Sequence, residues 1–181
     1  MAFDLKVPTL IAGCKASGLI CKLVSTPLWN LLENKTINIL EMNRYYLMLK
    51  TGLQVAATNV LDFMLGRIRP FGDEVEIRED LVYESLVEQS EYDNECESFL
   101  SVILVALAKY VNRKFEDFLP GSIYSDPSDE LKSKVGSVEK HNKFSERIFA
   151  YFDNLLRFKP HINTLASEAY ITFSVNRTGE L

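Results

Sequence analysis

The stretch FLSVILVALAKYV at residues 99–111 decides the fold class of this chain. Ser101 and Lys109 are its clearly polar residues, so a helix over it would be apolar on nearly every side. We expect such a helix to be buried, because a helix on a protein surface keeps a polar face. The run is also shorter than the roughly 20 apolar residues that span a membrane. Charged residues on both sides of it predict one helix over 94–119 with a core segment and a solvated end.

A second long pattern, at residues 37–66, has apolar side chains at alternating steps of three and four residues. The stripe consists of Ile39, Met42, Tyr46, Leu49, Leu53, Ala56, Val60 and Phe63. This spacing places them on one face of a helix, and few charges flank the face, so the helix belongs in a multi-helix bundle. We expect a bend at Gly52 and an end at Gly66, before Pro70.

Shorter helical patterns occupy residues 8–24, 27–34, 80–89, 144–158 and 163–175. Thr26 and Pro27 are expected to separate the first two helices, and Trp29 to fill the core. In the last helix, Leu165, Ala166, Ala169 and Phe173 are expected to point inward, with Tyr170 as a further candidate. Together the patterns predict an all-α fold, a single irregular helical bundle of about six to eight helices in one domain over residues 1–181. Residues 120–142 lack apolar periodicity, apart from a helical turn or two within 128–135.

The charge distribution limits the classes of partner. Residues 70–130 contain 4 basic and 16 acidic residues, whereas 1–69 and 131–181 are basic by 4 and 3 charges, for a net charge of −5. An acidic middle segment repels phosphate backbones unless it faces away from them. Three cysteines without disulfide-like spacing, and no leader pattern at the N-terminus, predict an intracellular protein that does not contact a membrane. Nucleus and cytoplasm are equally compatible with these features.

No catalytic signature is visible in the sequence. The chain lacks glycine-rich phosphate loops and a nucleophile elbow, and its acidic run at 93–97 lacks the spacing of a calcium loop. We therefore expect no enzymatic activity, no cofactor and no bound metal, with Cys14 and Cys21 as buried inert thiols. An enzyme would require a site assembled from distant residues, for example Cys96 with His141 or His161.

One basic cluster is a candidate contact for a partner. Its residues are Lys132, Lys134, Lys140, His141, Lys143 and Arg147. Basic residues interleaved with aromatic ones can bind single-stranded nucleic acid, but here only Tyr124 and Phe144 are close in sequence. A solvated loop that contacts an acidic partner is the alternative.

Several short strings, in this order, suggest a resemblance. They are PLWNLLE at 27–33, LPGSIY at 119–124, KHNKF at 140–144 and EAYITFS at 168–174. As a set, spread over residues 12–178, they resemble a group of uncharacterised multicopy animal proteins that look derived from transposable elements. The resemblance implies no catalytic activity and a chain that is part of a longer open reading frame.

Three hypotheses for the function follow. The first is a non-catalytic helical module that binds another protein or self-associates, because the apolar inventory exceeds what one small core hides. The second is a nucleic-acid-associated part of a mobile-element protein that uses the basic cluster. The third is an enzyme whose site is not visible in the sequence. An exposed apolar patch favours the first, a continuous basic face the second, and a pocket that gathers thiol, imidazole and carboxylate groups the third.

Overall fold

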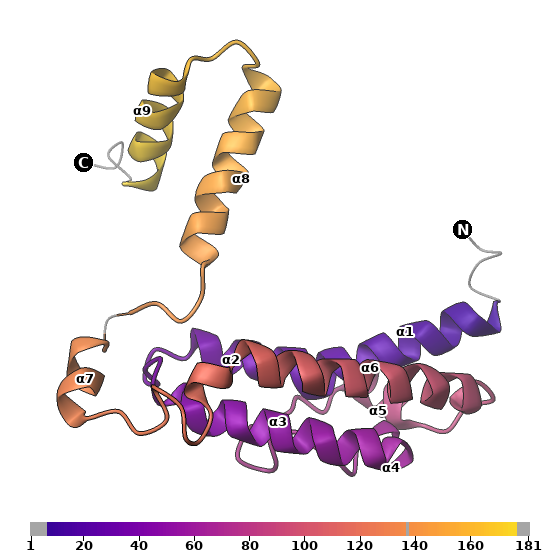
Figure 1. The fold of residues 1–181 in the computed structure, drawn as a ribbon. Helices are drawn as coiled ribbons and strands as arrows, with labels where there is room; N and C mark the ends of the chain where they lie inside the picture. Colours follow the sequence, from indigo (N-terminus) through magenta and orange to yellow (C-terminus); the bar gives the residue numbers. More distant parts are fainter. Residues whose placement is uncertain (1–6, 137, 177–181) are drawn as a thin grey trace. The chain divides into compact units, whose positions relative to one another are not determined.

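A computed structural model describes residues 7–136 and 138–176, and all regular structure in this part of the chain is helical (Figure 1). The elements are α1 (Pro8–Ile20), a π-helical turn (Cys21–Ser25), α2 (Thr26–Glu33), α3 (Met42–Thr58), α4 (Val60–Met64), α5 (Leu81–Val87), α6 (Asp93–Lys114), a 3₁₀ turn (Glu116–Phe118), α7 (Asp129–Lys134), α8 (Lys143–Phe158) and α9 (Thr164–Val175). Because α1 and α2 form one continuous run, the nine α segments make eight helices. The predicted all-α fold is confirmed.

Contacts group the chain into two compact units, Met1–Val138 and Glu139–Leu181. Each unit is described by itself below. The sequence predicts one domain over residues 1–181. That prediction concerns cooperative folding, which contact grouping does not measure, so it stays a prediction.

The core of the first unit forms where α6 packs against α3 and α1 (Figure 1). Leu100 and Leu104 of α6 and Leu49 and Leu53 of α3 are fully buried. Residues 99–111 therefore pack against the apolar stripe on α3. Apart from Ile39, which is half-buried, every residue of that stripe is buried, because the three- and four-residue steps keep it on the face toward α6.

The prediction that residues 99–111 are buried on every side is wrong. Val102 is 70% exposed, and Val105 and Tyr110 are exposed as well. The buried residues of α6 lie on the side that packs against α1 and α3. An all-apolar sequence does not indicate which side a neighbouring helix covers, so one face of α6 stays open to solvent.

The predicted break between the first two helices is replaced by the π-helical turn. The ring of Pro27 clashes with an α-helical carbonyl four residues back, and its nitrogen carries no hydrogen. The chain widens instead: the N–H of Thr26 donates to the carbonyl of Cys21, five residues earlier. Pro27 and Leu31 face inward, and Trp29 is exposed rather than placed in the core.

The helix predicted over 37–66 begins at Met42 and breaks at Asn59, whose backbone leaves the helical region with φ −133° and ψ 59°. The bend expected at Gly52 does not occur. Gly52 lies instead where the backbone of Pro70 crosses α3. The predicted end at Gly66 is confirmed by its positive φ of 71°, a conformation that glycine adopts without steric cost.

The second unit is a hairpin of α8 and α9, with 16 and 12 residues (Figure 1). Asn163 caps α9, since its side-chain oxygen accepts the N–H of Ala166 at 2.8 Å. Among the described side chains of this unit, only Leu155 and Ser167 are buried. The predicted inward face of α9 is wrong: the buried residue of the helix is Ser167, and the side chains of Leu165, Ala166, Ala169, Tyr170 and Phe173 are exposed.

Candidate functional site

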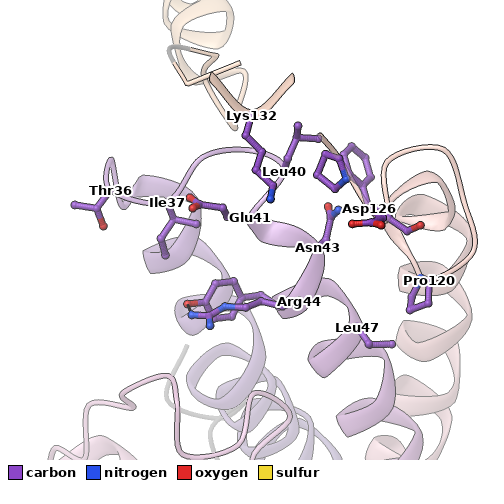
Figure 2. A pocket seen from close by; sticks show the side chains of 14 residues that line it. Thr36, Ile37, Leu40, Glu41, Asn43, Arg44, Leu47, Pro120, Asp126 and Lys132 are labelled. Atoms are coloured by element: carbon purple, nitrogen blue, oxygen red, sulfur yellow. Dashed lines mark hydrogen bonds between the residues drawn. The ribbon is translucent and has the colours of Figure 1, made fainter. Parts of the chain in front are cut away.

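A pocket of about 620 Å³ opens at the N-terminal end of α3, within the first unit (Figure 2). Its wall combines the chain before and within α3, at residues 36–47, with the segment that follows α6, at 118–132. Tyr46 of α3 stacks on Phe115 with ring centroids 3.9 Å apart, which brings these two segments together. Arg44, Glu41, Asp126 and Lys132 contribute charges of both signs to the wall.

Asn43 fixes the loop at 124–127 against α3. Its side-chain amide donates a hydrogen bond to the carbonyl of Tyr124, and this bond sets the orientation of the amide. Its Oδ1 atom is buried and lacks a hydrogen-bond partner among the described residues.

Two charged side chains of the pocket, Glu41 and Arg44, form hydrogen bonds within the fold. The Oε2 atom of Glu41 accepts the backbone N–H of Asn38 at 2.7 Å. Arg44 donates to the hydroxyl of Tyr45, and this bond raises the pKa of the guanidinium. The described wall contains hydroxyl, amide, guanidinium, ammonium and carboxylate groups but neither thiol nor imidazole.

The structure places the six predicted contact residues in both units. Lys132 and Lys134 lie on α7, where each forms an ion pair within its own helix, with Asp129 at 3.4 Å and with Glu130 at 2.6 Å. The other four lie at 140–147, at the beginning of the second unit. There His141 Nε2 is 3.9 Å from a carboxylate oxygen of Glu139. A single contact surface formed by all six stays a prediction.

The cysteines differ from expectation. Cys14 and Cys21 are exposed, so the prediction that they are buried is wrong. Cys96 is buried, and burial raises the pKa of its thiol to about 11. Because the thiolate is the nucleophilic form, a thiol with this pKa is poorly suited to nucleophilic catalysis at neutral pH. The described residues contain no group of three or more His, Cys, Asp or Glu that could hold a metal ion.

Sequence reasoning missed two lysines that hold the first unit together. The ammonium of Lys15 is 9% exposed and donates to the carbonyl of Glu88 at 2.7 Å and to Asp93 at 2.6 Å. Seven residues later on the same helix, Lys22 donates to both oxygens of Asp80 at 2.7 Å. The two lysines therefore tie α1 and the π-helical turn to the starts of α5 and α6. The signal in the sequence was two lysines at a two-turn spacing in an otherwise apolar helix.

The continuous helix Pro8–Glu33 contains these lysines. It is the one helix in the described chain whose length and mean hydropathy, 1.2 over its best window, would suffice to cross a membrane. Core helices of water-soluble proteins pass the same test. In this structure Ala12, Ala16 and Leu19 of the helix are fully buried within the first unit.

The second unit presents an apolar groove of about 500 Å³ along one face of the α8–α9 hairpin. On the α8 side it is lined by Ile148, Phe149 and Phe152, and on the α9 side by Ile171 and Val175 among smaller polar residues. Glu168 is the charged residue of this lining. A second hollow on α9 continues the groove through Glu168 and Thr172 to Leu165 and Phe173.

Sequence reasoning also missed this apolar groove. The sequence pattern places Leu165 and Phe173, which line the continuation of the groove, in the interior of a single bundle. The available signal was the composition of α9, which contains Glu168 as its one charged residue in 12.

Comparison with known proteins gives no relative: no protein-family model, no curated protein and no solved structure matches this chain.

Proposed function

We propose that this chain is a non-catalytic helical protein-interaction module, and that it contacts its partner through the α8–α9 hairpin. The observation that supports the proposal is the exposure of large apolar side chains on that hairpin. Phe149 lines the groove and is 69% exposed, and Leu165 lines its continuation and is 76% exposed, whereas Phe158 and Tyr170 are exposed outside both. Scattered apolar residues are ordinary on a surface, but a contiguous apolar groove marks a contact site.

The energetics of the hairpin support the same proposal. Most of the stability of a helix in a protein comes from the packing of its apolar face, and short isolated helices are marginal in water. Within the described hairpin, that packing buries one apolar side chain, Leu155, together with Ser167. A further surface that covers the hairpin would therefore stabilise it, and a partner protein supplies such a surface.

The two alternatives have less support. For an enzyme, the buried neutral Cys96 is a poor nucleophile, and the polar pocket brings no base near a thiol. For nucleic-acid binding, Lys132 and Lys134 are paired with carboxylates of their own helix. The transposable-element resemblance likewise stays a prediction.

The test replaces one exposed apolar residue of the hairpin by a charge in the full chain. Phe149→Glu should abolish the capture of a specific partner from the native cell. Ala150→Glu is the matched control, because Ala150 is exposed on the same helix and lies outside the groove lining. Equal capture by both variants would contradict the proposal. Loss of capture only when Lys140 and Lys143 are reversed in charge would assign the contact to the basic segment instead.

A further inference from the structure

We propose that the surface covering the hairpin is a second copy of this chain, and that two α8–α9 hairpins pack groove to groove as a four-helix bundle. This inference rests on the proposed function, since it names the partner of the same surface. Antiparallel helix pairs with short connections are the ordinary halves of such bundles, and two-fold dimers are the commonest protein assemblies.

The first argument is the area available. Phe149, Phe152, Leu165 and Phe173 are between 38% and 76% exposed on the groove and its continuation along α9. A large side chain has about 200 Å² of surface, so these four leave about 480 Å² open in each copy. Two copies together then bury about 950 Å² of these side chains, and the half-buried Ile148, Ile171 and Val175 of the lining bring the total to roughly the 1,000 Å² expected of a biological interface.

The second argument is electrostatic. A two-fold contact places the same patch on both sides, so a patch with strong charge of one sign repels its own copy. Here the groove and its continuation contain Glu168 as their one charged residue. The charged residues Glu146, Asp153 and Arg157 of α8 lie outside both linings. Two copies of the groove and its continuation can therefore face each other without strong charge repulsion. The same surface lacks the charge that would select an acidic or basic partner.

The third argument is the pattern of large and small residues. The α8 wall of the groove contains Phe149 and Phe152, and the α9 wall contains the smaller Thr172 and Val175. Cores of helical bundles interdigitate large side chains with small ones. A second hairpin inserted in the opposite direction would place its phenylalanines over the small residues of the first. The same patch thus supplies both the protruding and the receiving side chains.

The experiment measures the mass of the purified full-length chain by sedimentation equilibrium at micromolar concentrations. The wild type and Ala150→Glu should be dimers, and Phe149→Glu and Leu165→Glu should be monomers with unchanged helix content. A monomeric wild type would overturn the proposal. Dimers that persist in both groove variants would overturn it too, because they would place the contact elsewhere.

A second readout does not depend on destabilising variants. Thr172→Cys, made with Cys14→Ser and Cys21→Ser so that the exposed native thiols are removed, should form a covalent dimer with a short bifunctional maleimide. Ala150→Cys in the same background should not. If the chain proves monomeric while Phe149→Glu still abolishes partner capture, the proposed function holds and the second copy is the wrong partner.

Discussion

Gly52→Ala should destabilise this protein, although alanine is the better helix former. Gly52 lies inside α3, and a Cβ atom built on it would be 2.3 Å from the carbonyl oxygen of Pro70 and 2.4 Å from its Cα. Both atoms belong to the backbone of a buried residue, so no side-chain rotation relieves the overlap. The substitution therefore forces the segment around Pro70 away from α3.

The magnitude follows from two opposing effects. Replacing glycine by alanine in a helix interior gains about 1 kcal/mol. Overpacking a close contact costs roughly 1–3 kcal/mol, and a backbone overlap this short belongs at the upper end. We expect a net loss of about 2 kcal/mol, which for a chain of this length lowers the melting temperature by about 4–8 °C.

Gly13→Ala is the matched control. Gly13 also lies within a helix, α1, but nothing is within 4 Å of its Cβ position. Here only the propensity gain applies, and the free energy of unfolding should rise by roughly 0.5–1 kcal/mol. Urea unfolding followed by circular dichroism measures both variants. If Gly52→Ala is as stable as the wild type, or if the two variants shift in the same direction, the packing argument is refuted.

Two further predictions concern the first unit. Cys14 and Cys21 should react with a thiol reagent in the folded protein, whereas Cys96 should react only on unfolding; simultaneous reaction of all three would contradict its burial. Lys15→Met should destabilise the fold by about 3 kcal/mol, at the lower end of the range for a broken buried ion pair, because Asp93 is partly exposed. Burial by itself would raise the pKa of the Asp93 carboxyl group. Hydrogen bonds from Lys15 and Ser90 outweigh this effect and lower the pKa below the ordinary value of 3.8. The stability that this ion pair contributes is thus present above pH 3.8 and lost as the pH falls further, so the difference between wild type and variant should shrink in acid.

The helices were predictable from sequence because their periodicity is long and regular. The steps of three and four residues in α3 identify a buried face without any knowledge of its neighbour. Gly66 and Asn163 mark helix ends through local chemistry, a positive φ and a side-chain cap. Such signals act within one or two turns, so the sequence alone contains them.

Which side of an all-apolar helix segment is buried could not be predicted from the sequence. In residues 99–111 of α6 and in α9 nearly every position is apolar or small, so periodicity gives no direction, and tertiary packing decides which face is covered. The buried face of α9 contains Ser167, whereas Leu165 is exposed, which is the reverse of what hydrophobicity indicates. The Lys15 network is equally non-local, since its acceptors at 88 and 93 lie more than 70 residues away.

The candidate contact was only partly accessible to sequence reasoning. Nearness in sequence grouped six basic residues into one cluster, but it ignored the acidic residues one helical turn earlier. On a helix, residues three and four apart are neighbours, so Asp129 and Glu130 pair with Lys132 and Lys134 once α7 forms. Sequence alone did not establish that α7 is helical, and the pairing depends on that helix.

The open faces of α6 and α9 differ in a way that decides which of them suits an interface. The exposed face of α6 combines Val102 and Tyr110 with the charged Lys109 and Arg113. Cores of protein interfaces are depleted of charged residues, so this mixture is typical of a solvated surface. On the groove and its continuation along α9, by contrast, Glu168 is the one charged residue. Val102→Glu should therefore leave the mass of the purified chain unchanged, whereas Leu165→Glu should halve it. If instead Val102→Glu dissociates the dimer, α6 rather than the hairpin forms the contact between copies.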